Sequence, residues 1–281
     1  MQIHILEKNM KINNSFGAAA LLTAMLGLTP ASAELFFSES FDYGDDRDNI
    51  QNVSDWQTTS GVLYYDPDGL SHPGMPNESG GSFHHDFGSG NRNITYDVNI
   101  DKLSAAGPGD EFWLTGLIQL ANHDGLSRVQ FNTGSNVDGL GFGVAESGDV
   151  QFYGSINEGA NSWHNTGATA DADGSTYLFL VQAIRGSGTF NDRETTINFW
   201  FNPQDTSSVG ALGTPDFTNS LSKFGRTGVW DEVSIGLSNQ SRADEIRFGD
   251  SLDAVMIPEP GMLLLFGMGL FGLMAFRHRR R

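Results

Sequence analysis

Cysteine is absent from this 281-residue chain, and basic residues are scarce, with 16 Lys and Arg against 34 Asp and Glu. Without disulfides the fold must be held by its core, by bound ions, or by both. The net charge of −18 excludes an electrostatic nucleic-acid binder, because affinity for phosphates comes chiefly from Lys and Arg. It also repels anionic polymers, and it is compatible with cations, with neutral or cationic glycans and with simple solubility.

Helical periodicity is almost missing between residues 34 and 256. Short runs of strand-forming residues alternate there with Gly, Asn, Asp and Ser clusters that are typical of turns. The runs cover residues 35–41, 61–65, 92–100, 112–121, 128–132, 141–145, 150–156, 176–185, 195–201, 232–237 and 245–248. This pattern predicts an all-β fold, with two antiparallel sheets packed as a jelly-roll sandwich, in one domain at 34–256.

The N-terminus has the pattern of a secretory leader. Lys8 and Lys11 precede an apolar run of 13 residues at 16–28, and Ala31 and Ala33 form a small-x-small cleavage site. Residues 1–33 are therefore predicted to be a signal peptide read by the general secretory machinery. A first transmembrane helix is the alternative, and it is disfavoured because the apolar run is short and ends at Pro30.

The C-terminus, residues 257–281, has three ordered parts. A rigid motif comes first, then an uncharged stretch at 261–276 that holds 16 residues, and then a basic cluster. That stretch is short for a permanent membrane anchor, which needs roughly 20 residues. The positive-inside rule keeps the basic end in the cytoplasm and the body outside. The motif is Pro258, Glu259 and Pro260, and the orienting cluster is Arg277, Arg279, Arg280 and Arg281.

These three parts resemble the PEP-CTERM sorting signal of Gram-negative bacteria. The resemblance implies recognition by an exosortase, transient anchoring in the inner membrane, and delivery to the outer surface or the exopolysaccharide matrix. Whether the tail is cut or retained stays open. An ordinary tail anchor, or single-pass helix, is the alternative interpretation.

The exported part is more acidic than the whole chain, since residues 34–257 carry 10 Lys and Arg against 32 Asp and Glu, about −22. Segments 39–43, 199–201, 230–235 and 243–249 resemble the first and last strands of concanavalin A-like (laminin G-like) jelly rolls. The resemblance implies that the terminal strands pair near each other, and it implies carbohydrate binding.

No catalytic motif is evident, because the chain has no G-x-S-x-G elbow, H-E-x-x-H pair or phosphate loop. Retaining glycoside cleavage needs two carboxyls roughly 5 Å apart on one sheet face. The pairs Asp231-Glu232 and Asp244-Glu245 do not place acids at alternate positions of one strand. We therefore expect a protein that is not an enzyme.

For a glycan site, the sequence favours a tryptophan in polar loop-like surroundings. Trp163, with Asn161 and Asn165 beside it, fits best, and Trp56 comes second. Trp113 and Trp200 lie in apolar strands, which predicts burial in the core. A Trp163 folded under its own loop is the competing interpretation.

No cofactor is required by any motif, and calcium is the leading metal because hard cations bind several oxygen ligands. Asp171 and Asp173 supply such ligands, as do Asp66 and Asp68. Asp-Gly turns are also ordinary hairpin connectors, so both interpretations remain.

These features predict an exported protein of the bacterial surface or matrix, sorted by an exosortase and acting as a non-catalytic glycan-binding module. A purely structural matrix protein with no small ligand is one alternative. A glycoside hydrolase with unrecognised acids is the other.

Overall fold

The computed structural model describes residues 33–44, 48–75, 80–85, 92–122, 125–133, 139–154, 162–187, 194–221, 224, 229–238 and 240–256. Cleavage residue Ala31, nearly all of the predicted leader, the C-terminal motif and Asn161 lie outside these ranges. Ala33, the last leader residue, is described and exposed.

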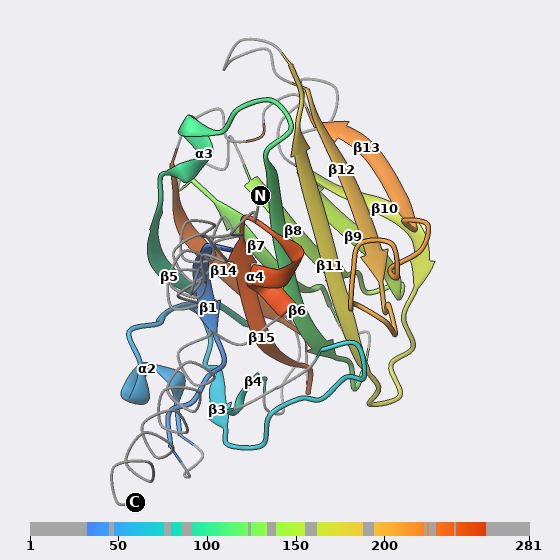
Figure 1. The fold of residues 1–281 in the computed structure, drawn as a ribbon. Coiled ribbons are helices and arrows are strands. Elements are labelled where there is room, and N and C mark those ends of the chain that lie inside the picture. The colour runs from blue at the N-terminus through green and yellow to red at the C-terminus, as the bar shows by residue number, and fades with distance from the viewer. Residues whose placement is uncertain are drawn as a thin grey trace, which may run out of the picture. The chain divides into compact units, whose positions relative to one another are not determined.

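The described chain is built from two antiparallel sheets (Figure 1). One has eight strands, in the order β13-β12-β11-β6-β15-β4-β3 with β1 added beside β15, and the other has seven, in the order β10-β9-β8-β7-β14-β5-β2. The eight-stranded sheet comprises β1 (Leu35–Glu39), β3 (Tyr64–Asp66), β4 (Ser82–His84), β6 (Glu111–Gln119), β11 (Thr176–Arg185), β12 (Thr195–Phe201), β13 (Phe217–Leu221) and β15 (Arg242–Gly249). The seven-stranded sheet comprises β2 (Gln57–Ser60), β5 (Arg92–Ile100), β7 (Ser127–Asn132), β8 (Gly139–Val144), β9 (Asp149–Gly154), β10 (Ser162–Thr169) and β14 (Trp230–Leu237). Three short helices complete the described elements: α2 (Ile50–Val53), α3 (Lys102–Ala105) and α4 (Leu252–Met256).

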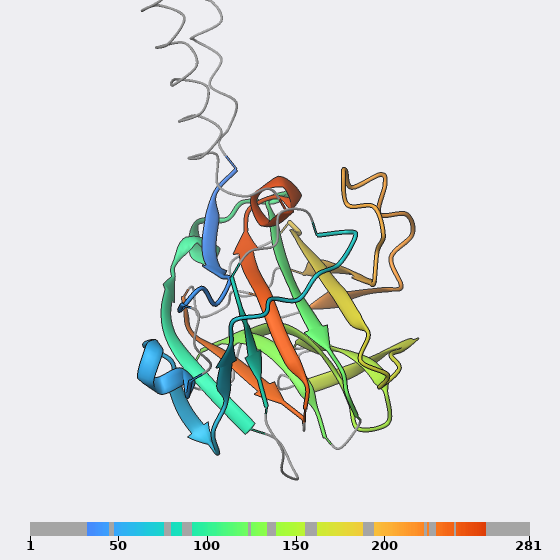
Figure 2. The ribbon, with the colours of Figure 1, turned by 90° about the horizontal axis from the view of Figure 1, so that it is seen from below.

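The fold class predicted from the sequence is confirmed. Strands β5, β11 and β12 have the predicted bounds, and the first strand pairs with the last, β1 with β15 (Figure 2). Four strands were missed, namely β2, β4, β10 and β13. Each of these is short, at an edge, or rich in polar residues, so the alternation of apolar side chains that marks a half-buried strand is weak there.

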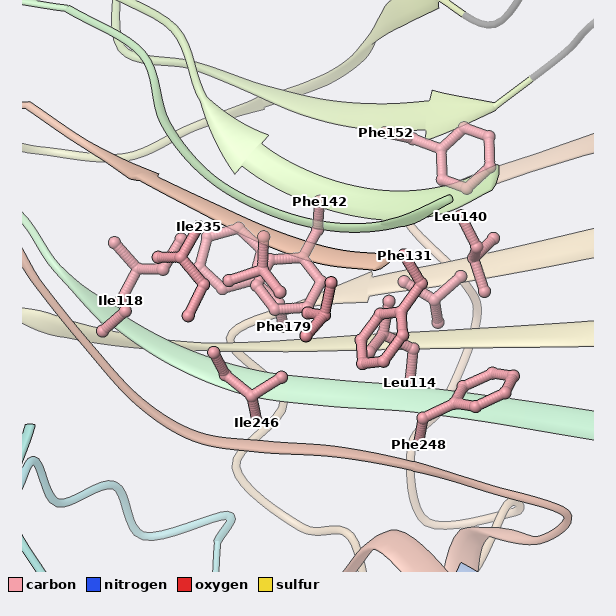
Figure 3. Close-up of a cluster of buried hydrophobic side chains, with 14 of the residues drawn as sticks. Leu114, Ile118, Phe131, Leu140, Phe142, Phe152, Phe179, Ile235, Ile246 and Phe248 are labelled. Carbon is pink, nitrogen blue, oxygen red and sulfur yellow. The ribbon is translucent and has the colours of Figure 1, made fainter. Parts of the chain in front are cut away.

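The main core lies between the sheets, where inward side chains from both meet (Figure 3). Phe142 of β8 stacks on Phe179 of β11, with ring centroids 4.8 Å apart and both rings fully buried. Strand alternation explains this, because Leu140, Phe142 and Val144 all point to one side of β8.

A second apolar cluster covers the opposite face of the eight-stranded sheet. Trp113 of β6 stacks on Trp200 of β12 at 5.9 Å, and Val255 of α4 packs into the same cluster. The prediction that both tryptophans are buried is confirmed. The eight-stranded sheet is therefore covered by apolar side chains on both faces.

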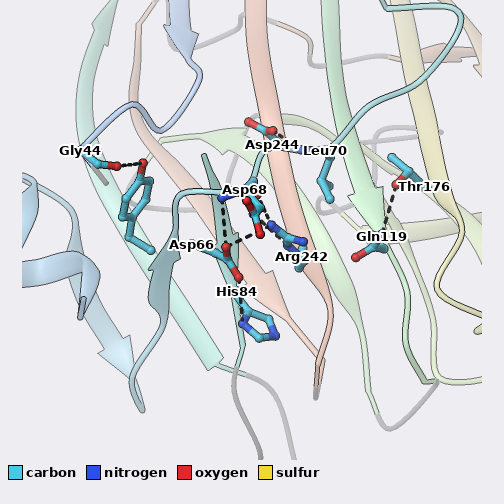
Figure 4. A network of polar contacts seen from close by, with 11 residues as sticks. Gly44, Asp66, Asp68, Leu70, His84, Gln119, Thr176, Arg242 and Asp244 are labelled. Atoms are coloured by element: carbon cyan, nitrogen blue, oxygen red, sulfur yellow. Dashed lines mark hydrogen bonds and ion pairs between the residues drawn. The ribbon is translucent and has the colours of Figure 1, made fainter. Parts of the chain in front are cut away.

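The segment that crosses this sheet after β3 is held by charged side chains (Figure 4). Asp244 of β15 accepts a hydrogen bond from the Leu70 amide at 2.7 Å, and Arg242 donates to the Asp68 carbonyl. Arg242 also lies 3.6 Å from the Asp66 carboxylate. The Arg242 guanidinium therefore lies beside Asp66 and Asp68, which the sequence suggested as calcium ligands.

Asp244 makes stability depend on pH. Burial raises the pKa of Asp244 from 3.8 to about 8, although the Leu70 amide acts in the opposite direction. The stability that this group contributes is complete below the ordinary pKa and is lost as the pH rises through about 8. Asp244→Asn should remove this loss while keeping an oxygen for the Leu70 amide. The difference in unfolding free energy between Asp244→Asn and the wild type should therefore change in favour of the variant as the pH rises, by up to about 1.4 kcal/mol per pH unit between roughly pH 5 and 8.

Denaturant unfolding at stepped pH measures this difference, with Asp173→Asn as the control. Hydrogen bonds from Ser175 lower the pKa of the exposed Asp173, so its effect is confined to acid pH. Parallel pH profiles for Asp244→Asn and the wild type would contradict the prediction.

Candidate functional site

The seven-stranded sheet turns a polar face away from the core. Inward positions such as Ile94, Phe131 and Ile235 belong to the main core, so their neighbours along each strand point outward. We call this surface the polar face. Its side chains are Trp163 of β10, Gln151 and Tyr153 of β9, Arg128, Gln130 and Asn132 of β7, Glu232 and Ser234 of β14, and Asn93, Thr95 and Asp97 of β5.

Strand β8 contributes no side chain to the polar face, because its outward positions are Gly139, Gly141 and Gly143. Neighbouring strand β7 comes so close that only glycine fits. A Cβ added at Gly141 would lie 2.5 Å from the Val129 carbonyl oxygen, and one at Gly143 would lie 2.6 Å from that of Ser127. These three glycines are buried and leave β8 without a side chain on this face, and we call them the glycine strip.

Aromatic and cationic side chains meet over the glycine strip. The Trp163 and Tyr153 ring centroids are 4.9 Å apart, and the Arg128 Cζ lies 6.0 Å from the Trp163 ring centroid. Strands β9 and β8 separate β10 from β7 in the sheet. Arg128 and Trp163 can approach because no β8 side chain stands between them. Trp163 stays partly exposed, whereas Tyr153 and the three glycines are buried, so the tryptophan is the aromatic side chain that a ligand can reach here.

Arg128 is a half-buried cation with few partners. Its Nη2 donates to the Asn93 Oδ1 over a long 3.5 Å, and its Nε is buried without a hydrogen-bond acceptor. Burial lowers the pKa of the Arg128 guanidinium, and the neighbouring Tyr153 phenol acts in the opposite direction. The group still stays charged at neutral pH, as arginines do in proteins.

Two carboxylates face each other farther along the same surface. Glu232 of β14 is paired in register with Asp97 of β5, on one side, and with Asn132 of β7, on the other. Burial raises the pKa of Glu232, and the charges of Asp231 and Asp97 add to this. Acids sought at alternate positions of one strand could not reveal a pair built across two strands.

Trp163 lies in strand β10 and not in a loop, so that part of the prediction is wrong. The strand forms because Trp163 and His164 pair with Tyr153 and Phe152 of β9. His164 points inward, where its ring stacks on Phe152 at 6.5 Å. Asn165 is exposed, and its Oδ1 accepts a hydrogen bond from the Gly167 amide at 2.8 Å.

The second tryptophan predicted to be exposed, Trp56, is buried, with only 2% of its surface exposed. Its indole Nε1 donates to the Glu39 carboxylate at 3.1 Å, and its ring packs edge-on against Phe83 at 5.0 Å. The polar residues that flank Trp56 in the sequence do not indicate this burial, because the ring packs against residues that are distant in the chain.

Asp171 and Asp173 lie exposed in the turn that joins β10 to β11. The Asp173 Oδ1 accepts a hydrogen bond from the Ser175 amide at 2.9 Å, as a turn-forming aspartate does. Among the described residues, no three His, Cys, Asp or Glu side chains are grouped to hold a metal ion. Calcium at this turn stays a prediction.

Comparison with known proteins identifies the C-terminus. Residues 257–281 match the family model of the PEP-CTERM protein-sorting motif. Among curated proteins, none matches the sequence. The chain is similar to a botulinum neurotoxin type C structure concerned with cell entry and two ganglioside molecules, at 10% identity and a TM-score of 0.44, over 84% of this chain and 51% of that one.

Two further solved structures are similar at the same low level. The botulinum neurotoxin serotype D/C binding domain matches at 10% identity and a TM-score of 0.45, over 83% of this chain and 52% of that one. A mutant of the alginate lyase Aly36B in complex with an alginate trisaccharide matches at 11% identity and a TM-score of 0.37, over 76% and 98%. The matches to the neurotoxin structures span about half the length of those chains.

Within the described ranges, no helix has both the length and the apolar character needed to cross a membrane. The matched motif lies beyond them, at residues 257–281. The chain therefore carries a PEP-CTERM protein-sorting motif, which implies export, transient membrane anchoring and handling by an exosortase, behind an antiparallel two-sheet jelly-roll sandwich.

Proposed function

We propose that this protein is a non-catalytic glycan-binding module, delivered by its sorting motif to the outer surface or the exopolysaccharide matrix. One observation carries the proposal: a partly exposed Trp163 stands with Tyr153 and Arg128 over the glycine strip. A sugar ring needs a flat apolar surface for its C–H groups and polar groups around it for its hydroxyls. The polar face offers an aromatic surface and polar groups on neighbouring strands.

The rest of the polar face supplies the hydrogen-bonding groups. Amide and hydroxyl side chains that are partly exposed, among them Asn93, Thr95 and Gln151, alternate with core residues along the strands. They stand on paired strands and not on loops, which holds their positions for recognition.

Trp163→Ala should weaken glycan binding by about tenfold or more, as removal of a central aromatic contact does in other interfaces. The exported chain, kept in mild detergent, would be melted with a panel of soluble polysaccharides, since a ligand that binds only the folded state raises the melting temperature. Titration of the stabilising polymer then gives the affinities of the wild type and the variant.

Phe217→Ala is the matched control, because Phe217 is a partly buried aromatic on β13, the edge strand of the other sheet. It should lower stability and leave affinity unchanged. Equal losses of affinity in both variants would contradict the site. No stabilisation by any polymer would favour a purely structural matrix protein. Release of new reducing ends from a polymer, abolished by Glu232→Gln, would make the protein a glycoside hydrolase.

A further inference from the structure

Arg128 stands out because the exported part is strongly acidic, yet this cation has no acidic partner among the described residues. The ion pairs of those residues join His84 and Arg242 to Asp66, Lys102 to Glu34, and Arg247 to Glu245, and Arg128 is in none of them. A half-buried charge without a counter-ion is unfavourable, and buried arginines are normally paired. The polar face therefore holds one positive charge that no described side chain compensates.

Part of the Arg128 guanidinium has no partner among the described residues. Its Nε is buried without an acceptor, so a ligand would have to reach the two terminal nitrogens, and the one hydrogen bond there, from Nη2 to Asn93, is long at 3.5 Å. The planar guanidinium matches a carboxylate through two parallel hydrogen bonds, a geometry that a hydroxyl cannot reproduce. The adjacent Trp163 ring, 6.0 Å from the Arg128 Cζ, would take the face of the sugar that carries this carboxylate.

The acidic pair lies at a distance from Arg128 along the sheet. In β7, Arg128 is opposite Gly236 of β14, and Asn132 is opposite Glu232. Four residues of strand separate the two positions, about 13 Å at 3.3 Å per residue. The polar face thus has a basic end, beside the tryptophan, and an acidic end at Glu232 and Asp97. A ligand with a carboxylate would be oriented by this polarity.

We propose that the polar face selects glycans that carry a uronic acid, with the sugar carboxylate on Arg128 and the sugar ring on Trp163. This inference rests on the proposed glycan binding and adds the chemical class of the ligand. The net charge predicts that the protein as a whole repels anionic polymers, whereas Arg128 would attract a carboxylate locally. A desolvated contact with Arg128 is short-ranged, whereas the repulsion is screened beyond about 8 Å at physiological salt.

The test uses galacturonate and mannuronate oligomers, each beside its methyl ester, which keeps the sugar and removes the charge. Affinities of the exported chain in mild detergent would be measured at about 0.15 M salt. The wild type should bind the acid form of one sugar about tenfold or more tightly than its ester, as hydrogen bonds to a charged group do. Arg128→Gln should lose the preference, because its affinity for the acid falls to the level of its affinity for the ester. Arg128→Lys should restore part of it.

Lys102→Gln is the control, because it removes the same charge from an exposed pair with Glu34. It should leave the preference intact, and melts of all variants without ligand should show that Arg128→Gln remains folded. Equal binding of acid and ester, or a preference that survives in Arg128→Gln, would overturn the inference. Binding of dextran sulfate as tight as that of the uronic-acid oligomers would also overturn it, since dextran sulfate carries negative charge without a carboxylate.

Failure of the inference can be told apart from failure of the proposed function. If esters and acids bind equally and Trp163→Ala weakens both, the glycan site stands and the role of Arg128 falls. If neither form binds, and no neutral polysaccharide of the panel does, both fall together.

Discussion

Arg247→Ala is expected to lower the free energy of unfolding by about 3–5 kcal/mol. Arg247 is 6% exposed and pairs with Glu245, whose side chain is fully buried. The substitution would leave the Glu245 carboxylate in the interior without its cation, and that uncompensated charge causes most of the loss. Arg247 also donates to the Val255 carbonyl of α4 at 3.2 Å, so the helix would lose an anchor.

The backbone around this pair shows why it is specific. The register of β15 against β6 shifts between Asp244 and Arg247, and Glu245 has a φ of 50°. A residue other than glycine is held in the left-handed region only where its surroundings fix it. Glu245 and Arg247 pair at this bulge, and Arg247 also reaches the Val255 carbonyl of α4.

Chemical denaturation of the wild type and the variant measures the loss. Lys102→Ala serves as the control, since its pair with Glu34 is exposed and should contribute less than about 1 kcal/mol. A double variant, Glu245→Gln with Arg247→Met, should recover part of the loss because no unpaired charge remains. The prediction fails if Arg247→Ala and Lys102→Ala lower stability equally.

Strands with apolar residues at alternate positions could be predicted from the sequence because one sheet face is buried. Residues 195–201 show this, since Ile197 and Phe199 are fully buried and Thr196 is exposed. Strand β10 could not be predicted this way, because its side chains are mostly polar and its pairing with β9 is a tertiary property. A strand of this kind reads as a loop until its partner is known.

The polar face was predictable only in part. A tryptophan in polar surroundings led to Trp163, but the same criterion also led to Trp56, which is buried. Arg128 and the Glu232–Asp97 pair could not be found, because each depends on which strands are neighbours. The alternating glycines at 139, 141 and 143 were visible in the sequence, and they mark a strand with one bare face.

The boundary of the folded part gives the sorting motif a defined context. Helix α4 ends at Met256, and Val255 and Met256 are buried in the cluster over the eight-stranded sheet. In the sequence, Pro258 is two positions after Met256, and the apolar stretch at 261–276 follows soon after. Little chain separates the sandwich from the membrane segment, so an exosortase must work close to a folded domain.

Replacing Pro258, Glu259 and Pro260 together by alanine is expected to abolish exosortase handling, leaving the full-length chain in the inner membrane. Proline disfavours helix, whereas alanine has the highest helix propensity. Three alanines would favour helix across the motif and so oppose the extended backbone that a processing enzyme needs. Fractionation of the producing cells, with mass measurement of the chain in each fraction, gives the result.

Two variants make the outcome specific. Asp253→Ala changes an exposed residue of α4 near the motif and should be sorted like the wild type. Pro258→Gly with Pro260→Gly keeps Glu259 and an extended, non-helical backbone, because glycine also disfavours helix. If backbone accessibility is what the prolines provide, this variant retains part of the processing that the alanine variant loses. Normal sorting of the alanine variant would show instead that the apolar stretch and the terminal arginines suffice.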